Sequence, residues 1–144
     1  MPAEAPAFVV DASVGAKGLL EEEGSEAAAA LLLLPGVVLH VPGLFFVESS
    51  AAVRRAVLRS GLPASGAAAR MERLCDLKVV VSEDRDLVPP AMDLANAEGL
   101  SVYDALYVAL SDRTGAPLVT ADRRLHGRLR GTRHRVLGLW EFAA

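Results

Sequence analysis

Short apolar runs and longer segments with apolar residues at helical spacing alternate along the whole chain. Runs of valine, leucine and phenylalanine that end at polar, proline or glycine residues predict strands at 8–10, 37–41, 79–81, 118–119 and 136–139. Apolar residues three and four positions apart predict helices at 14–20, 26–34, 44–60, 64–74, 89–99, 102–110 and 125–129. This alternation predicts an α/β fold, a single three-layer α/β/α domain over residues 1–144 with a central, mostly parallel sheet.

Several predicted helix ends carry capping signals. Ser101 stands just before one apolar helical pattern, and Gly115 stands where the end of that helix needs a left-handed residue. Ser25 is expected to cap the helix that follows it. Residues 83–86 form an acidic stretch that reads as a break, and the two prolines at 89–90 are expected to open the next helix.

Composition narrows the class of protein. Apolar residues make up 52% of the chain and aromatic residues only 5%, so the core must consist of alanine, valine and leucine. The net charge of -3 argues against binding nucleic acid by bulk attraction but allows a local basic patch. Cys75 is the only cysteine, expected as a small buried residue in a reducing compartment. The longest apolar run, 27–34, is far shorter than the ~20 residues of a membrane span, so we expect a cytoplasmic protein with no membrane partner.

Four acidic residues stand out by position. Asp11 follows the first predicted strand and Asp122 follows the fourth, whereas Glu48 and Asp104 stand in early turns of helices. Two of the four also have a purely structural interpretation. Asp104 lies three residues after Ser101 and fits a capping box, and Asp122 fits the N-cap of the helix after it.

These acids meet at one edge of the sheet if the strands are parallel, because ligands bind at the carboxyl ends of parallel strands. Clustered carboxylates raise one another's pKa unless a cation offsets their charge. Hard oxygen ligands suit Mg²⁺ or Mn²⁺, and such ions also bind substrate phosphates. The pattern therefore indicates metal-assisted hydrolysis of a phosphodiester.

Four motifs, in order and at family-like intervals, resemble a PIN-domain ribonuclease, and more narrowly a VapC-type toxin of a bacterial type II toxin–antitoxin pair. They are Val-Val-Asp-Ala-Ser-Val at 9–14, the segment from Pro42 to Glu48 leading into Arg54 and Arg55, Ser-Val-Tyr-Asp-Ala-Leu-Tyr at 101–107, and Leu-Val-Thr-Ala-Asp at 118–122. The resemblance covers nearly the whole chain and implies the PIN fold.

The resemblance also implies roles for individual residues. The acidic metal site and catalytic set would be Asp11, Glu48, Asp104 and Asp122. Two small hydroxyl residues, Ser13 and Thr120, match supporting positions beside that site. One position departs from the family pattern: many relatives carry asparagine three residues after the helix glutamate, where this chain has Ala51. The supporting amide is therefore either missing or replaced by Ser49 or Ser50.

By the same resemblance the reaction is endonucleolytic RNA cleavage, with Mg²⁺ or Mn²⁺ activating a water. The substrate expected for the family is a structured RNA with an exposed loop. Six of the 15 basic residues follow Asp122 within the tail, and RNA contact is expected from Arg123, Arg124 and Arg128. The alternative for this tail is a solvated helix face and loop. With so few aromatic residues, the sequence names no residue that stacks on a base.

The family also implies a protein partner. A small antitoxin would occupy the groove of the toxin and check its activity. The helix predicted from Glu26 to Leu34 has more apolar residues than one buried stripe needs, which suggests a surface for an antitoxin helix or for a second toxin chain in a homodimer. This idea requires that Leu31 and Leu34 are not both covered by the chain's own fold.

Two other classes of protein compete with the nuclease. A receiver domain needs a second acid pair near the first strand and a lysine on a late strand. An aspartate-nucleophile phosphatase needs aspartate where this chain has Ser13, so both fit poorly. A non-catalytic PIN-like module that sequesters RNA or a protein is the nearer alternative. Its only support in the sequence is Ala51.

Overall fold

A five-stranded parallel sheet forms the centre of the protein, whose computed structural model describes residues 4–142. The strands are β1 (Ala7–Val10), β2 (Val38–Pro42), β3 (Val80–Ser82), β4 (Leu118–Thr120) and β5 (Val136–Gly138). Their order is β3-β2-β1-β4-β5, and every neighbouring pair is parallel. Strand β1 is therefore central, and the ends of β1 and β4 lie side by side, which brings the segments after them together.

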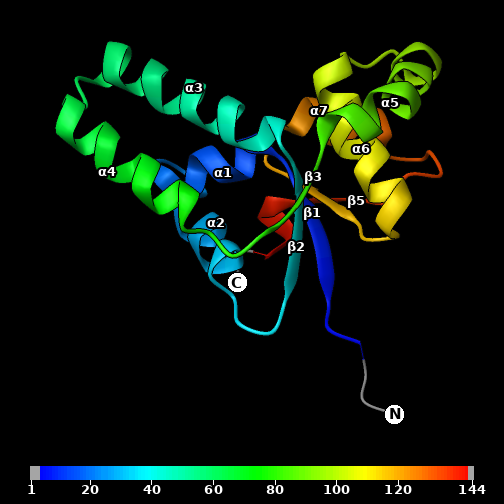
Figure 1. The fold of residues 1–144 in the computed structure, drawn as a ribbon, viewed down its shortest axis with the longest axis horizontal. Helices are drawn as coiled ribbons and strands as arrows, with labels where there is room; N and C mark the ends of the chain where they lie inside the picture. Colours follow the sequence, from blue (N-terminus) through cyan, green and yellow to red (C-terminus); the bar gives the residue numbers. More distant parts are fainter. Residues whose placement is uncertain (1–3, 143–144) are drawn as a thin grey trace.

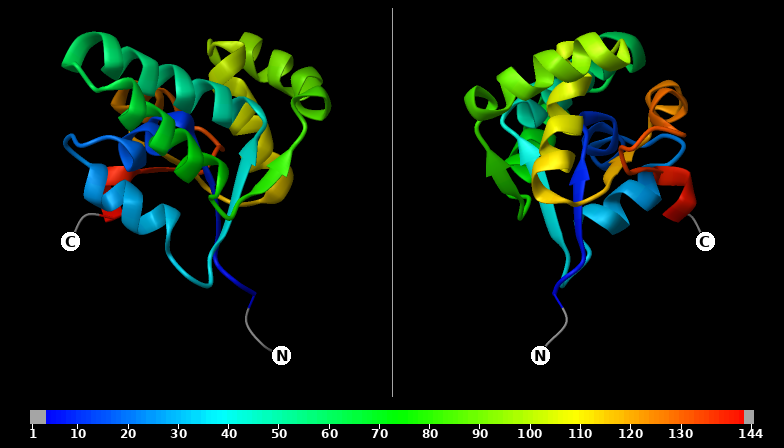
Figure 2. Two further views of the ribbon diagram at one scale, coloured as in Figure 1. Left: turned by 60° about the vertical axis from the view of Figure 1, so that its left-hand side comes forward. Right: turned by 90° about the vertical axis from the view of Figure 1, so that its right-hand side faces the viewer.

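Helices cover both faces of this sheet (Figures 1 and 2). They are α1 (Ala12–Leu19), α2 (Ser25–Leu32), α3 (Leu44–Ser60), α4 (Ala64–Cys75), α5 (Asp84–Glu98), α6 (Val102–Thr114) and α7 (Arg123–Leu129), followed by a short 3-10 helix, η1 (Leu139–Phe142). Figure 1 shows α1 to α4 on the left of the sheet and α5 with α6 on the right. The predicted α/β architecture with a parallel sheet is confirmed.

The core consists of aliphatic side chains, as the composition predicts, and helix α6 runs through it. All seven residues from 105 to 111 are buried, so α6 contacts protein on every side. A helix with apolar residues all round is typical of such a central position. Phe45 and Tyr107 are the largest fully buried side chains, and Tyr107 carries a polar hydroxyl into this core.

Caps fix the ends of α6 as predicted. The Ser101 side chain accepts a hydrogen bond from the Asp104 N–H at 3.1 Å, and Gly115 ends the helix with φ of 74°. Two details elsewhere differ from the predictions. Ser25 is not the N-cap of α2: Gly24 takes that position in a left-handed conformation, and Ser25 Oγ accepts from the Glu22 N–H instead. The helix also ends at Leu32, two residues before the predicted end.

The acidic stretch at 83–86 is not a break, because Asp84 and Asp86 form the first turn of α5. Acidic side chains there complement the helix dipole, and the Asp84 carboxylate also accepts a hydrogen bond from the Leu44 N–H at 3.1 Å. The two prolines consequently lie inside α5 and do not open it.

The prediction of a buried cysteine is wrong. Cys75 is exposed in the last turn of α4, a helix that buries only Leu74 among its twelve residues. Among the helices of residues 4–142, none combines the length and the apolar content needed to cross a membrane.

Candidate active site

The sheet places Asp11 at the centre of the site. This residue directly follows β1 and caps α1, where its Oδ1 accepts hydrogen bonds from the N–H groups of Ser13 at 3.1 Å and Val14 at 3.3 Å. The hydroxyls of Ser13 and Thr120 each donate to one of its two carboxylate oxygens, both at 2.5 Å. Its side chain is thus fixed from both the start of α1 and the end of β4.

The two hydroxyls are themselves held by the backbone that follows β4. Ser13 Oγ accepts from the Ala121 N–H at 2.8 Å, and Thr120 Oγ1 accepts from the Asp122 N–H at 3.0 Å. Because each oxygen accepts from a backbone donor, its own proton remains directed at Asp11. The predicted supporting role of Ser13 and Thr120 therefore has a geometric basis, although their part in catalysis stays a prediction.

Burial makes the negative charge of Asp11 unfavourable. Only 5% of the residue is exposed, and this burial raises its pKa from 3.8 to about 6, against the opposing effect of its hydrogen bonds. The charge of Asp104 raises the pKa slightly further. A proton or a cation at this position would relieve the cost.

Glu48 reaches the site from α3 and is held by a residue that the sequence analysis did not single out. The Tyr107 hydroxyl donates to Glu48 Oε1 at 2.7 Å. Burial raises the pKa of both side chains, and the charge of Asp104 adds to the rise for Glu48. Tyr107 lies three residues after Asp104 on the same face of α6, and this helical spacing is the signal that could have revealed it.

Neither serine replaces the asparagine that is missing at Ala51. Ser50 Oγ donates to the Phe46 carbonyl at 2.6 Å, and the buried Ser49 Oγ has no hydrogen-bond partner within the described part of the chain. The support for Glu48 comes from Tyr107 instead. Of the two alternatives, replacement by a serine is therefore wrong.

Asp104 and Asp122 approach the site from α6 and from the segment after β4. Arg124 Nη2 lies between them, 3.6 Å from Asp104 Oδ2 and 3.9 Å from Asp122 Oδ2. Burial, followed by the charge of Asp122, raises the pKa of Asp104. Asp122 also caps α7, because its side chain accepts hydrogen bonds from the N–H groups of Arg124 and Leu125. The predicted N-cap role is therefore confirmed, and Asp122 lines the acidic cavity as well.

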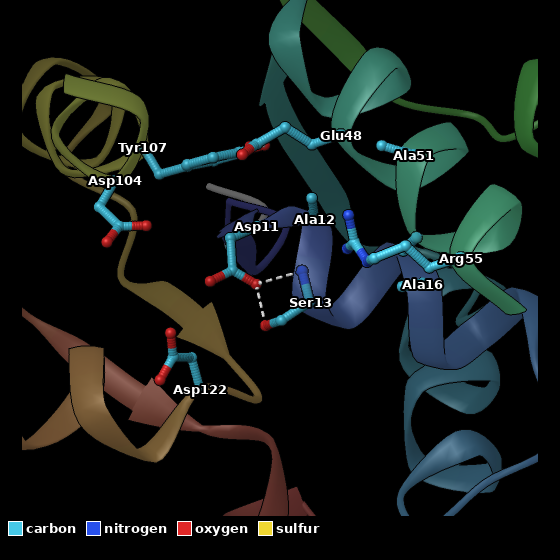
Figure 3. A pocket seen from close by; sticks show the side chains of 11 residues that line it. Asp11, Ala12, Ser13, Ala16, Glu48, Ala51, Arg55, Asp104, Tyr107 and Asp122 are labelled. Atoms are coloured by element: carbon cyan, nitrogen blue, oxygen red, sulfur yellow. Dashed lines mark hydrogen bonds between the residues drawn. The ribbon is translucent and has the colours of Figure 1, made fainter. Parts of the chain in front are cut away.

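All four acids line one cavity of about 340 Å³ (Figure 3). Small side chains, Ala12, Ala16, Ala51 and Ala52, leave the space open. Arg55 reaches into the same cavity from α3, two helical turns beyond Glu48. Arg55 belongs to the second sequence motif, which implied no role for it.

The donor chemistry of this cavity fits a hard divalent cation. Carboxylate oxygens are the ligands such ions prefer, and three of these four acids have a raised pKa that a positive charge would lower. Within residues 4–142, however, no three Asp, Glu, His or Cys side chains are arranged to hold a metal ion by themselves. A Mg²⁺ ion commonly uses one or two carboxylates and keeps several waters, so a closed protein shell is not required.

The three arginines predicted to bind RNA have different positions. Arg124 lies between Asp104 and Asp122. Arg123 stacks on Trp140, with its guanidinium carbon 4.1 Å from the ring centroid, and Arg128 lies beside Gly99 at the end of α5. Neither of these two lines the acidic cavity, and RNA contact by all three stays a prediction.

A family model described as "PIN domain" matches residues 8–129, which include all four acids. The chain belongs to the PIN-domain family. The family named by the sequence motifs is therefore confirmed, and the match covers every strand except β5.

Curated PIN-domain relatives carry VapC names, which bears out the narrower resemblance. "Ribonuclease VapC3" of Pyrobaculum aerophilum is 33% identical over 120 residues, covering 82% of this chain and 91% of that protein. "Ribonuclease VapC9" of Mycobacterium tuberculosis is 33% identical over 118 residues, covering 82% and 87%.

Solved structures share the PIN fold at lower identity. A crystal structure from Pyrobaculum aerophilum has a TM-score of 0.67 and 22% identity, covering 99% of this chain and 98% of that one. VapC20 of Mycobacterium tuberculosis, described as a sarcin–ricin loop cleaving toxin, has a TM-score of 0.64 and 18% identity, with coverage of 83% and 93%. A toxin–antitoxin complex from Klebsiella pneumoniae has a TM-score of 0.66 and 12% identity, with coverage of 92% and 97%.

Proposed function

We propose that this protein is a divalent-metal-dependent endoribonuclease, the toxin of a type II toxin–antitoxin pair. The observation that carries the proposal is the meeting of four carboxylates, from four separate segments, around one cavity. Three of them have a pKa raised by burial, so the fold keeps acidic groups where their charge is unfavourable. Such an arrangement is typical of a functional site.

A bound Mg²⁺ or Mn²⁺ would polarise the scissile phosphate and lower the pKa of an attacking water. The carboxylates that would hold it are Asp11, Glu48, Asp104 and Asp122. Hydrogen bonds from Ser13 and Thr120 fix the orientation of Asp11, and Tyr107 fixes Glu48. Their common effect is to hold the acidic oxygens in place before substrate arrives, which is the role of groups behind metal ligands.

Two arginines complete the electrostatics of the site. Arg55 lines the cavity, and Arg124 lies at its edge beside two of the acids. Guanidinium groups bind phosphate oxygens with two parallel hydrogen bonds, so both are placed to receive an RNA backbone that the acids alone would repel.

The names of relatives support RNA as the substrate. Two curated relatives at 33% identity are called ribonucleases, and the structural neighbour VapC20 is described as cleaving the sarcin–ricin loop. A structured RNA with an exposed loop is therefore the substrate class that we propose, in the cytoplasm where such RNA is found.

Cleavage of total bacterial RNA by the purified chain tests this function. We expect discrete products with Mg²⁺ or Mn²⁺ and none with EDTA. In Asp11→Asn the rate of cleavage should fall by at least about a hundredfold. Asp93→Asn is the matched control, because Asp93 is an exposed carboxylate of α5 outside the acidic cavity. If intact chain and Asp11→Asn bind RNA equally and neither cleaves it, the non-catalytic binding module becomes the better account.

The antitoxin partner is part of the proposal, and the titles of structural neighbours support it, since one is a toxin–antitoxin complex. Leu31 is buried in the core at 3% exposure, so it cannot contribute to a docking surface. Leu33 and Leu34, just beyond α2, are 73% and 49% exposed and line a groove with Leu77. We place an antitoxin helix in this groove, and Leu33→Glu should escape neutralisation by the antitoxin while cleaving RNA normally.

The homodimer remains a separate proposal. Val88 and Met92 stand one turn apart on α5 and are 42% and 50% exposed, which gives a small apolar patch away from the antitoxin groove. Sedimentation of the intact chain and of Met92→Lys tests it: a dimer that the substitution splits is the expected result, and a monomer in both would refute it.

A further inference from the structure

A second cavity, of about 310 Å³, lies next to the acidic one and has no role in the site described above. Two segments of the chain contribute to both cavities. Asp122 lines the acidic cavity, while its chain neighbours Ala121 and Arg123 line the second one. On α1, Ala16 lines the first cavity and Lys17 the second. The remaining wall comes from the start of α2 and from η1, which pack against each other near the C-terminus (Figure 2).

The far wall of this cavity is built around Trp140. Its ring lies so close to Gly138 of β5 that a β-carbon there would overlap ring atoms. The His126 ring meets it edge-on, with centroids 5.0 Å apart. The Arg123 guanidinium stacks over the ring at 4.1 Å from its centroid. Trp140 is therefore fixed by its neighbours and in turn holds Arg123 beside the cavity.

Two basic side chains and one acidic residue line the polar part of the cavity. Lys17 and Arg123 both line it, in a chain whose net charge is -3. Lys17 Nζ donates to the Glu23 carbonyl at 2.8 Å and lies 3.3 Å from Glu22 Oε1, so it is held in place with one acidic neighbour. The Glu23 residue also lines the cavity, and Leu139, Ala27 and Ala121 supply the apolar surface.

A nucleotide combines the two features that this cavity offers. A simple anion would use the two cations but not the indole and aliphatic wall. An apolar helix would use that wall but would bury the Arg123 charge without an anionic partner. A nucleotide carries a phosphate for the cations and a flat base for the apolar wall, which is how single strands are bound in general. Because neighbouring residues of α1 and of the segment from Ala121 to Arg123 line the two cavities, such a nucleotide would lie beside the acidic cavity.

We propose that this cavity binds one nucleotide of single-stranded RNA adjacent to the phosphodiester that is cleaved. Arg123 and Lys17 contact its phosphate, the wall of Trp140 and Leu139 contacts its base, and Trp140 is a positioning residue for Arg123. The proposal rests on the proposed ribonuclease function and adds to it a subsite that selects unpaired RNA.

Trp140 is the only tryptophan of the chain, so its fluorescence reports this cavity alone. The full chain is titrated in EDTA, which prevents cleavage, with short single-stranded oligoribonucleotides of mixed sequence. We expect a saturable change in fluorescence. Arg123→Ala should weaken binding on the order of tenfold and lower the salt dependence by about one counterion. Arg59→Ala removes the same charge from the exposed end of α3 and should have little effect.

Three results would overturn the subsite: an unchanged Trp140 signal while RNA binding is detected by filter retention, an equal effect of Arg59→Ala, or an equal response to polyglutamate. A kinetic arm separates this failure from failure of the nuclease. Trp140→Phe should raise KM for RNA and leave kcat nearly unchanged, because it loosens Arg123 without touching the acids. Full cleavage with unaltered KM in both Arg123→Ala and Trp140→Phe would refute the subsite and leave the ribonuclease intact, whereas no cleavage by any chain would refute the ribonuclease.

Discussion

Replacing Asp11 by asparagine should stabilise the metal-free protein, although it removes a carboxylate of the proposed metal site. Burial raises the pKa of Asp11 from its ordinary 3.8 to about 6 in the folded chain. An acid whose pKa is raised by folding binds protons more tightly in the native state, so the native state loses stability as pH rises from about 4 to about 6. Above that range the buried charge of Asp11 lowers the free energy of unfolding by its full amount.

The difference between those two pKa values, at ~1.4 kcal/mol per pKa unit, corresponds to about 3 kcal/mol at neutral pH. Asparagine keeps one acceptor oxygen but presents an amide to the second hydroxyl, which reverses one of the bonds from Ser13 or Thr120. We subtract ~1 kcal/mol for that rearrangement. The expected gain is therefore about 2 kcal/mol, or roughly 4 to 8 °C in Tm for a chain of this size.

Urea and thermal unfolding in EDTA, at about pH 8 and about pH 4, measure this gain. The gain should be nearly complete at the higher pH. At the lower pH, Asp11 is protonated in the folded state and about half ionised in the unfolded state, so the burial penalty falls to about 0.5 kcal/mol. The ~1 kcal/mol rearrangement then leaves the variant slightly less stable than the intact chain. The exposed Asp93→Asn control should shift stability by less than ~0.5 kcal/mol at either pH. A variant no more stable than the intact chain at about pH 8, or equally stabilised at about pH 4, would refute the burial argument.

Further predictions concern the support of Glu48 and the packing of α1. Tyr107→Phe removes the donor to Glu48, so the rate of metal-dependent cleavage should fall about tenfold to a hundredfold. Tyr103 is an exposed tyrosine of the same helix, and Tyr103→Phe should cleave RNA normally. Equal rates in both variants would contradict the role of the Tyr107 hydrogen bond. Gly15→Ala should destabilise the protein by about 1–3 kcal/mol, because a β-carbon there would lie 2.5 Å from a side-chain oxygen of α3. Gly127→Ala in α7 meets nothing within 4 Å and should stabilise by up to ~1 kcal/mol; thermal unfolding that ranks the two variants the other way would refute the packing argument.

The meeting of Asp11, Asp104 and Asp122 at one cavity was predictable because their positions depend on topology rather than on detailed packing. Asp11 and Asp122 follow neighbouring parallel strands, so they meet at one sheet edge whatever the side chains in between. Asp104 stands in the first turn of a helix with clear caps at both ends. Local signals and strand order were sufficient to bring these acids together.

Details that depend on contacts between distant segments were not predictable. The bond from Tyr107 to Glu48 joins residues 59 positions apart. Helical spacing places Tyr107 on the same face of α6 as Asp104, but nothing local indicates that its hydroxyl reaches Glu48. The same applies to Asp84: its bond to the Leu44 N–H favours an early start of α5, although the acidic run resembles a loop in sequence. Cys75 is exposed because α4 covers little of the core, which no composition rule can anticipate.

Helix capping shows the same division. Ser101 and Asp122 are caps both in sequence and in structure. Ser25 fails because the preceding Gly24 enters the left-handed region with φ of 89° and starts the helix one residue earlier. A serine next to a glycine offers two starting points for the helix, and the local sequence does not distinguish between them.

Binding of Mn²⁺ in the absence of RNA tests the central claim, that the four carboxylates form a divalent-cation site. The electron paramagnetic resonance signal of free Mn²⁺ is followed as intact chain, Asp11→Asn or Asp93→Asn is added. The account predicts saturable loss of signal with the intact chain and with Asp93→Asn, and an affinity lower by at least about tenfold with Asp11→Asn. Equal binding by Asp11→Asn, or no binding by the intact chain, would contradict it.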